Sequence, residues 1–522
     1  MNYGETEFWL VNVPLDIDNA HTYYFSSKEE QFDYFTTTLY GIKHYKDLNY
    51  QRKDHKIKIP APYDEVSKYN YVVYKNNATS SERTYYSFIK EYIYINNECT
   101  EIVIETDPIQ TYLFDYVVGD SFIEREHVND DTPGKHTQPE NLETGEYVCQ
   151  AYKDDEMLKE YVYILLVTEY EETLESGSKQ WIVADNSIYG GIPQGYSFLV
   201  FTDKLALSNE IRKYDSGKVD AIVGAIILPT GILKNWNGGK HLEFSTTPTT
   251  YEFFVDKPTK VLNYTPKNKK LLTYPYQSLV VSNNAGTSNI LYFEHFSEEK
   301  ASFKVSGIPV IGGSIKCVPT NYKKREENEE EGIMCGKFPT LSWSADLFTN
   351  WCTQNAVNIA LDVGSGTLTA LVGGALLFTG VGTSVGAGML AGGVMSVGKE
   401  IGQIYEHHFT PNSARGNLNG GDINTSNKTN TFHFLTMSIK EEYAKIIDRY
   451  FTMYGYKVSR LGKPLTNHRS RYWYTKIIDP FITGNIPHDE LNKIKKAYFN
   501  GITFWRKETT FRDYTDDNLI VE

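Results

Sequence analysis

Short runs of β-branched and aromatic residues, separated by Asn- and Ser-rich breakers, dominate the first third of the chain. The clearest are Tyr69–Tyr74 (YNYVVY), Ser87–Ile95 (SFIKEYIYI) and Glu101–Glu105 (EIVIE). Two more follow at Tyr161–Thr168 and Tyr196–Phe201. Val, Ile, Tyr and Phe favour the pleated, half-buried surface of a sheet, so runs of this length between turn residues predict strands. The pattern predicts an α+β, β-rich chain.

Helical periodicity appears near the C-terminal end of the sequence. It predicts one helix at Glu441–Tyr454 and a second from Pro487 to about Phe499, because apolar residues recur there every three or four positions. The residues expected on the buried faces are Tyr443, Ile446, Ile447, Tyr450 and Phe451 in the first helix, and Leu491, Ile494 and Tyr498 in the second. Gly455 and Gly501 follow the two helices, as expected for left-handed caps. We expect both helices to be packing elements.

One segment breaks the pattern, because Val363–Gly398 contains no Asp, Glu, Lys, Arg or His. A straight helix of that length would measure roughly 54 Å, whereas a bilayer core of about 30 Å needs some 20 residues. The segment can therefore cross a bilayer once, or enter and return as a hairpin. A second uncharged run, Ala221–Leu233, is too short to cross and is expected to be a buried strand or helix.

About a third of Val363–Gly398 is glycine, which weakens a helix interior in water by about 1 kcal/mol per site relative to alanine. Large apolar side chains are spaced between the glycines. These candidate membrane-insertion residues are Leu368, Leu371, Leu376, Leu377, Phe378, Met389, Leu390 and Met395. Small residues let neighbouring copies approach closely within a membrane. The mixture suits a segment with two states, one packed in protein and one in lipid.

Three other interpretations of Val363–Gly398 stay open at this point. A buried core loop is one, although a charge-free, glycine-rich insert of this length fills a core poorly. A permanent membrane anchor is another, but neither flank carries the basic bias that orients such anchors. A disordered linker is the third, although linkers rarely hold Leu, Phe and Met at this density.

Composition narrows the range of functions. The 522 residues include 40 Tyr, 26 Phe and 7 Trp. Tyrosine suits strands and protein interfaces, since it buries a large ring while keeping a polar hydroxyl. The formal net charge is −14, whereas tight DNA binding needs Lys and Arg to neutralise phosphates. We expect DNA to slide past such a protein without being gripped. The acidic run Glu326–Glu331 predicts an exposed, mobile loop.

The sequence shows no arrangement typical of catalysis or metal binding. Gly393–Glu400 (GVMSVGKE) ends in Glu where a P-loop needs Ser or Thr for magnesium. His407 and His408 are adjacent, so on a helix they point about 100° apart and cannot share one metal. The EREH run at Glu124–His127 would place its glutamates on one strand face and its histidine on the other, which favours salt bridges over acid–base catalysis. The cysteines form no CxxC pair; they are Cys99, Cys149, Cys317, Cys335 and Cys352. We expect no enzyme activity, no cofactor and no metal.

Several blocks carry a family resemblance. They are EIVIETDPIQTYLF at Glu101–Phe114 with SFIEREHV at Ser121–Val128, LLTYPYQ at Leu271–Gln277, YFTMYGYKVSR at Tyr450–Arg460, and DPFITGNIPHDELNKIKKAYFNGITFW at Asp479–Trp505. The glycine-rich apolar run also falls at the family's position, shortly before the Asn- and Gly-rich passage Asn417–Asn427. In these blocks the chain resembles the distal tail, or tail-knob, proteins of small short-tailed phages with protein-primed genomes (Salasvirus and picovirus types).

The resemblance implies a division of the chain. Residues 1–130 and 425–522 would form β-rich tube-wall domains, residues 131–344 the knob or outer region, and residues 345–424 a long hydrophobic loop. Val363–Gly398 would be the part of that loop that plugs the lumen and forms the pore.

The resemblance also implies a function and partners. The protein would form a homohexameric tube at the tail tip of the virion, attached to the upper tail and lower collar proteins. Its loops would close the lumen and, on infection, enter the host cytoplasmic membrane to make a channel for genome ejection. Double-stranded DNA would pass through without sequence recognition. The alternative is a tail-tip protein that binds a receptor or engages the cell wall without forming a pore.

Overall fold

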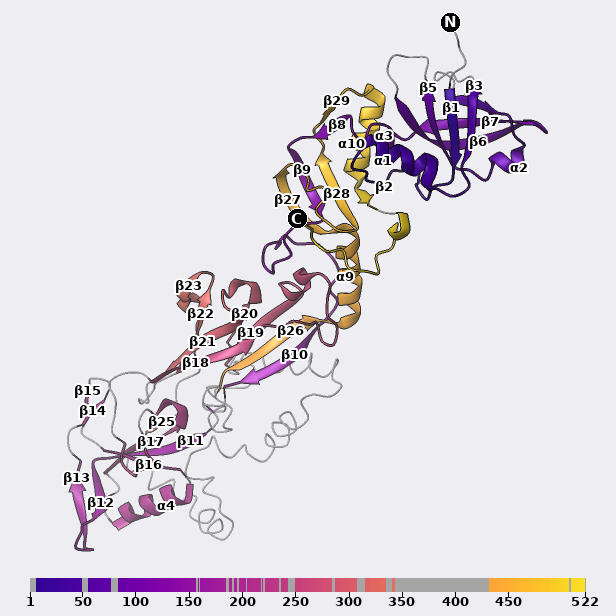
Figure 1. The fold of residues 1–522 in the computed structure, drawn as a ribbon. Coiled ribbons are helices and arrows are strands. Elements are labelled where there is room, and N and C mark those ends of the chain that lie inside the picture. The colour runs from indigo at the N-terminus through magenta and orange to yellow at the C-terminus, as the bar shows by residue number, and fades with distance from the viewer. Residues whose placement is uncertain are drawn as a thin grey trace. The chain divides into compact units, whose positions relative to one another are not determined.

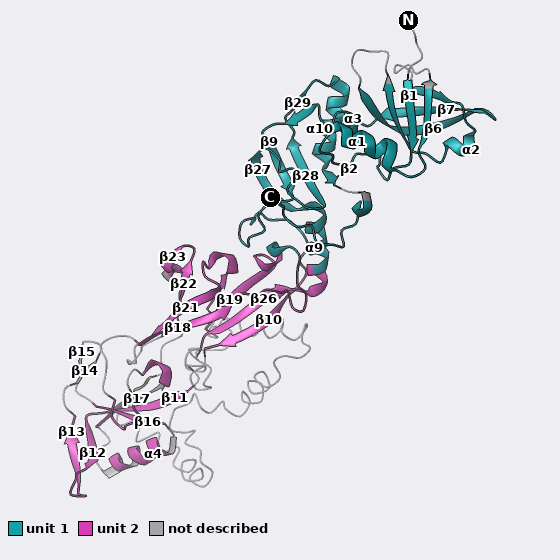
Figure 2. Cartoon of the chain, viewed as in Figure 1, with its two compact units in different colours: residues 1–143, 266–270, 445–522 teal, residues 144–265, 271–444 magenta. Residues whose placement is uncertain are grey.

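The structure is a computed structural model of the chain (Figure 1). It describes residues 6–48, 55–76, 83–155, 158, 160–184, 187–189, 192–194, 197–202, 204–216, 218, 221–233, 236–242, 249–283, 287–307, 315–334, 340–342, 431–506 and 508–521. Figure 2 shows two compact units. Unit 1 comprises Met1–Glu143, Pro266–Lys270 and Lys445–Glu522; unit 2 comprises Thr144–Thr265 and Leu271–Ala444. Both are rich in strands, so the predicted β-rich fold is confirmed.

The N-terminal part of unit 1 is a six-stranded sheet in the order β3-β1-β5-β6-β7-β4, in which all neighbouring strands are antiparallel. Its strands are β1 (Thr6–Val11), β3 (Lys43–Leu48), β4 (Lys56–Ile59), β5 (Tyr71–Asn76), β6 (Thr84–Asn96) and β7 (Cys99–Thr106). Alternate side chains of β1 and β5 belong to two separate apolar clusters. Trp9 and Val73 belong to one, and Phe8 and Val72 to the other. The centre of the sheet is therefore buried on both faces.

The second sheet of unit 1 joins the two ends of the chain, in the order β2-β30-β28-β9-β27 (Figure 1). Its strands are β2 (His21–Tyr23), β9 (Ser121–Glu126), β27 (Tyr456–Gly462), β28 (Tyr472–Asp479) and β30 (Ile502–Trp505). A small two-stranded sheet pairs β8 (Tyr116–Val118) with β29 (Ile482–Gly484). Tyr472 and Trp505 pack in one cluster with Trp9 and Tyr23. The chain ends therefore share a core, and unit 1 cannot be completed from either end alone.

The helices of unit 1 are short, apart from the two near the C-terminal end. They are α1 (Lys28–Asp33), the π-helix η1 (Tyr34–Thr38), α2 (Tyr63–Val66), α3 (Pro108–Thr111), α9 (Glu441–Tyr454), which starts in unit 2, and α10 (His488–Asn500). The two predicted helices are confirmed as α9 and α10. Ile494 and Tyr498 of α10 are buried as expected. On α9 the prediction for Ile446 is wrong, because its side chain is 66% exposed while Ala444 is fully buried. The buried stripe of α9 is rotated from the one predicted.

The described residues of unit 2 form five sheets. Their orders are β10-β26-β19-β20, β16-β11-β17-β25, β18-β21-β22-β23 with β24 also on β22, β12-β13, and β14-β15. The strands are β10 (Tyr147–Asp154), β11 (Tyr161–Val167), β12 (Glu169–Thr173), β13 (Lys179–Val183), β14 (Ser187–Tyr189), β15 (Ile192–Gln194), β16 (Ser197–Phe201), β17 (Ile222–Pro229), β18 (Thr249–Asp256), β19 (Gln277–Ser282), β20 (Ser288–Leu291), β21 (Lys300–Gly307), β22 (Ile315–Tyr322), β23 (Arg325–Glu327), β24 (Ile333–Met334), β25 (Thr340–Ser342) and β26 (His433–Ile439). Helix α4 (Lys204–Arg212) contributes Leu207 and Ile211 to the apolar cluster beside β11 and β16.

The strand predictions hold in both units. Each of the five predicted runs is a strand, namely β5, β6, β7, β11 or β16, with ends that shift by a few residues. The uncharged run Ala221–Leu233 contains β17, so the strand interpretation is correct there. The run Glu326–Glu331 is largely exposed, as predicted, but it is not an irregular loop. Strand β23 pairs with β22, and the 3₁₀-helix η8 (Glu329–Glu331) follows. Lys304 and Lys323 form ion pairs with Glu327 and Glu331 at 2.6 Å each.

Candidate functional site

The predicted membrane-insertion residues lie outside the described residues. These residues are Leu368, Leu371, Leu376, Leu377, Phe378, Met389, Leu390 and Met395, and all of Val363–Gly398 lies outside with them. Within the ranges that the structure describes, no helix is both long enough and apolar enough to cross a membrane. The structure describes the strands that precede and follow this segment, β25 and β26.

The described residues on both sides of 343–430 belong to unit 2. Strand β25 pairs with β17 before the segment, and after it Thr431 and Phe432 lead into β26. The Thr431 hydroxyl donates to the Asp155 carbonyl at 2.9 Å, and the Asp155 N–H donates to the Phe432 carbonyl at 3.2 Å. Phe432 is fully buried. The chain is thus fixed in unit 2 at the point where β26 begins.

Strand β26 is held on both edges, by β10 and by β19. Its Phe434 is almost fully buried, with ring centroids 4.6 Å from Phe253 and 4.8 Å from Phe303. Aromatic pairs at such distances stabilise a core by about 0.5–1.5 kcal/mol each, beyond the burial of their area. The return from the candidate segment is therefore a rigid part of the largest core of unit 2.

A buried ionic network lies in unit 1 around the Glu140 carboxylate. Arg125 and Lys270 form ion pairs with it, and the N–H of Lys457 donates to it at 3.0 Å. The exposed fractions of the side chains are 1% for Glu140, 8% for Arg125 and 4% for Lys270. Burial lowers the pKa of Lys270, although Glu140 opposes that shift. Arg125 also donates to the Gly455 carbonyl at 2.7 Å. The network fixes the positions of backbone segments and exposes no reactive group.

The glutamates of the EREH run, Glu124 and Glu126, also form ion pairs. The side chain of Glu126 is fully buried and accepts from the Arg460 guanidinium at 2.7 Å, while Glu124 forms an ion pair with Lys476 at 2.8 Å. The expected preference for salt bridges over acid–base catalysis is confirmed for these glutamates.

His127 is buried between backbone groups of two C-terminal elements. Its Nδ1 accepts from the Tyr474 N–H at 2.8 Å, which leaves Nε2 to donate to the Thr452 carbonyl at 3.1 Å. Burial, and then the charge of Arg469, lowers the pKa of His127 to about 3. The ring is therefore neutral at physiological pH and supports the structure. Among the residues that the structure describes, no three His, Cys, Asp or Glu side chains gather as a metal site.

Unit 1 also exposes large apolar side chains on neighbouring strands. Phe122 on β9 lies opposite Leu461 on β27, and the two are 39% and 76% exposed. Ile478 and Phe481, at the end of β28 and just beyond it, are 46% and 60% exposed. We call these four residues the apolar patch. Phe122 and Leu461 are direct neighbours across two strands, and contiguous exposed apolar surface is typical of protein–protein contact sites.

The sequence alone did not predict the ionic network around Glu140, the apolar patch, or a shallow pocket of unit 1 lined by Tyr63 and Tyr94. Glu140 lies 130 residues from Lys270 and 317 from Lys457 in the sequence, so no short-range sequence pattern predicts these contacts. Phe122 and Leu461 each sit in an ordinary strand pattern, and only the pairing of β9 with β27 brings them together.

In the described residues the chain builds two β-rich units that bury many aromatic side chains, and the buried charged groups of unit 1 hold backbone segments in place. Residues 5–117 match the sequence model of the N-terminus of caudoviral major tail proteins, so this part of the chain is similar to phage tail proteins. Residues 234–519, more than half of the chain, match the model of the C-terminal domain of tail knob protein gp9 of Bacillus phage phi29. The chain belongs to this family of tail knob proteins, which are structural parts of the virion and not enzymes.

Curated relatives agree over nearly the full length. The chain is 23% identical to tail knob protein gp9 of Bacillus phage phi29 and 24% identical to that of Bacillus phage PZA, with 96% of each chain covered in both comparisons. It is 21% identical to that of Bacillus phage B103, with 98% of this chain and 97% of the relative covered. Among solved structures, the tail knob protein gp12 of bacteriophage C1 shares the fold, with a TM-score of 0.61 at 15% identity over 99% of this chain and 100% of that one.

Proposed function

We propose that this tail knob protein closes the end of the tail lumen and, on infection, inserts Val363–Gly398 into the host cytoplasmic membrane as a channel for genome ejection. The observation that carries the proposal is the absence of ionisable side chains from this run, in a chain with a formal net charge of −14. Moving a charge into a bilayer core is costly, so a long charge-free run is what insertion requires. Its glycines suit a segment that also packs within protein.

The proposal includes a homohexameric assembly attached to the upper tail and lower collar proteins. The apolar patch supports it, because Leu461 and Phe481 would lose their exposed surface in contacts between subunits. The acidic net charge supports a lumen along which double-stranded DNA slides without sequence recognition. Several loops acting on one membrane patch would also insert more strongly than one.

Within the assembly we assign a role to each region. Residues 1–130 and 425–522 form the tube wall, 131–344 the knob region and 345–424 the hydrophobic loop. Unit 1 supports the first assignment, because it is built from both ends of the chain. Unit 2 supports a loop anchored at a rigid base, since β25 and β26 pair within it on either side of 343–430.

The test uses virions with Leu371→Asp and Leu377→Lys together, which place two charges in the run. We expect normal tails and normal adsorption, but no delivery of DNA and no potassium leakage from host cells. The matched control is Leu371→Val with Leu377→Ile, which keeps the segment apolar. DNA delivery by the charged variant at the control's rate would refute the pore.

The same experiment separates the alternative, a receptor-binding or wall-engaging tail tip without pore activity. In that case the charged variant would deliver DNA normally. A loss of adsorption in both variants would instead show that the segment serves attachment, which also contradicts the proposed pore.

A further inference from the structure

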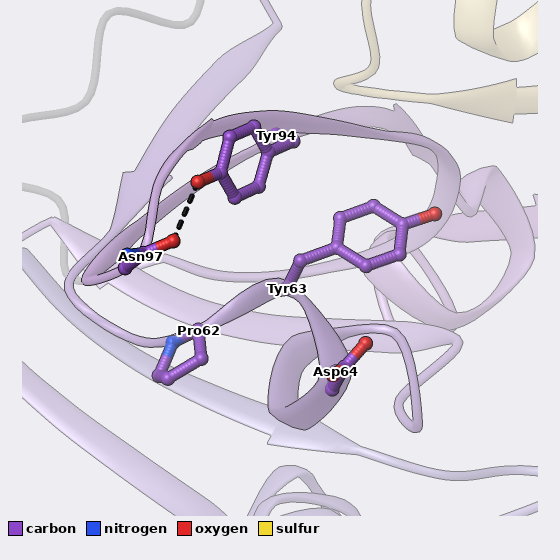
Figure 3. A pocket seen from close by; sticks show the side chains of 5 residues that line it. All are labelled: Pro62, Tyr63, Asp64, Tyr94 and Asn97. Atoms are coloured by element: carbon purple, nitrogen blue, oxygen red, sulfur yellow. Dashed lines mark hydrogen bonds between the residues drawn. The ribbon is translucent and has the colours of Figure 1, made fainter.

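A shallow pocket opens on unit 1 between helix α2 and the tip of the β6–β7 hairpin (Figure 3). It is lined by Pro62, Tyr63, Asp64, Tyr94 and Asn97 and has a volume of about 380 Å³. Small-molecule sites measure about 300–1,000 Å³, so the pocket can hold one small ring compound. Tyr63 and Tyr94 are 38% and 58% exposed, so two aromatic surfaces face solvent here.

Both walls of the pocket are fixed to the same sheet. Val66 anchors α2 because it is fully buried in the apolar cluster below. The hydroxyl of Thr100 on β7 donates to the Ala61 carbonyl at 2.9 Å, immediately before α2. The Tyr63 ring meets the Tyr92 ring of β6 edge to face, with centroids 6.4 Å apart. The pocket is therefore preformed, and binding need not order its walls.

The polar groups of the lining side chains are the hydroxyls of Tyr63 and Tyr94, the Asn97 amide and the Asp64 carboxylate. The Tyr94 hydroxyl donates to Asn97 Oδ1 at 2.6 Å, the dashed line in Figure 3. This bond occupies the amide oxygen, so the NH₂ group of Asn97 remains as a donor. Asp64 contributes a carboxylate, which accepts hydrogen bonds. Among the residues that the structure describes, no Lys, Arg or His lines the pocket, and Lys43 beside α2 forms an ion pair with Glu65 at 2.9 Å.

We propose that this pocket binds an uncharged pyranose ring of a glycan chain. A pyranose has an apolar face of C–H groups and a rim of hydroxyls that both donate and accept. The rings of Tyr63 and Tyr94 match the face, while Asn97 and Asp64 match the rim. A polymer that carries phosphate or carboxylate groups would meet the Asp64 charge with no cation to offset it. The proposal does not depend on membrane insertion.

The test measures binding of two neutral probes, maltotetraose and the tetramer of N-acetylglucosamine, to the full chain by saturation-transfer NMR and calorimetry. We expect at least one probe to bind in the millimolar range. Tyr94→Ala should weaken binding by about tenfold or more, because it removes one ring and frees the Asn97 amide. The matched control is Tyr40→Ala, which removes a fully exposed tyrosine elsewhere in unit 1 and should leave binding unchanged.

A second variant separates stacking from hydrogen bonding. Tyr94→Phe keeps the ring and loses the hydroxyl that fixes Asn97, so we expect a loss of about two- to fivefold. Both Tyr94 variants should keep the wild-type melting temperature, because this side chain is largely exposed. The proposal is overturned if the wild-type chain binds neither probe at about 10 mM, well above the millimolar dissociation constant expected. Unchanged binding in Tyr94→Ala, or stronger binding of dextran sulfate than of both neutral probes, would also overturn it.

Discussion

The two units are held together by different means. Unit 1 buries an ion pair with both partners inside, Arg125 with Glu140, whereas the buried Glu210 of unit 2 pairs with Lys213 and Lys240, whose side chains are each 34% exposed. The main core of unit 2 consists of aliphatic and aromatic residues. A buried ion pair contributes little net stability but is costly to break. Both units are stabilised by apolar cores, and unit 1 adds a buried ion pair that favours one arrangement of its segments.

The buried ion pair lies where separate segments of the chain meet within unit 1. Its three chain segments are Met1–Glu143, Pro266–Lys270 and Lys445–Glu522. The Glu140 carboxylate, in the first segment, contacts Lys270 in the second and Lys457 in the third. One buried charge thus joins all three segments, and a wrong pairing would leave it unsatisfied.

Glu140→Ala should give the largest effect. It leaves two cations buried without their carboxylate, and breaking such a network typically costs about 3–5 kcal/mol. Urea unfolding followed by hydrogen exchange should show protection lost in β9, β27 and β28 while β19 and β26 keep theirs. The matched control is Glu146→Ala, whose carboxylate is 76% exposed and pairs with Lys440. Equal effects of the two changes would contradict the contrast between the units.

Phe434→Leu tests the packed core of unit 2. It removes the ring contacts with Phe253 and Phe303, each worth about 0.5–1.5 kcal/mol, for a total of about 1–3 kcal/mol. The loss of exchange protection should appear in β19 and β26, and unit 1 should keep its own. Loss of protection in β28 instead would show that the units do not unfold independently.

Asp107→Ala probes a single buried carboxylate in unit 1. Asp107 caps α3 by accepting from the N–H groups of Ile109 and Gln110 at 3.0 Å each, and it also accepts from the Tyr71 hydroxyl at 2.9 Å. Loss of such a cap costs about 0.5–2 kcal/mol. Asp107→Asn keeps an acceptor oxygen and should restore most of the unfolding midpoint. An Asn variant as unstable as the Ala variant would show that the charge is required.

Acidification changes the stability of unit 1 by contributions of opposite sign, because the pKa values of His127 and His468 are lowered to about 3 and about 4 while that of Asp107 is raised. The folded pKa of His127 is about 3, below its ordinary 6.5, so the unfolded chain binds more protons and stability falls as pH drops from 6.5 towards 3. Burial raises the folded pKa of Asp107 to about 6 from 3.8, so its contribution rises as pH drops through that window. Urea midpoints at several pH values should show less acid loss in His127→Gln and more in Asp107→Asn. The reverse pattern would contradict both assignments.

Local sequence patterns predicted much of the fold, but for α9 they predicted the bounds of the helix and not its buried face. Its bounds and its capping glycine followed from the sequence, since the helical period and Gly455 are local features. The buried face did not follow, because Ala444 is small enough to be covered closely while Ile446 points to solvent. Periodicity shows that a helix has an apolar side, but the neighbouring elements decide which stripe is covered.

The prediction for the acidic run Glu326–Glu331 also missed a contact that the fold makes. Six residues with five glutamates suggest a mobile stretch in which like charges repel. In the sheet, however, Lys304 on β21 pairs with Glu327 on β23, with β22 between the two strands. Lys304 stands 23 residues before its partner, so no local pattern predicts that ion pair. Lys323 and Arg325, which pair with Glu331 and Glu330, stand directly before the run, and there the local sequence already held the offsetting charges.

By itself the sequence determined the strands, the two C-terminal helices and the charge-free run Val363–Gly398, because each follows from the pattern of neighbouring residues. The negative net charge follows from the composition. Only the tertiary structure decided that the chain ends share one sheet, that Glu140 joins three segments, and that Tyr63 and Tyr94 face one pocket. Those contacts link residues tens to hundreds of positions apart, and they depend on how whole elements pack.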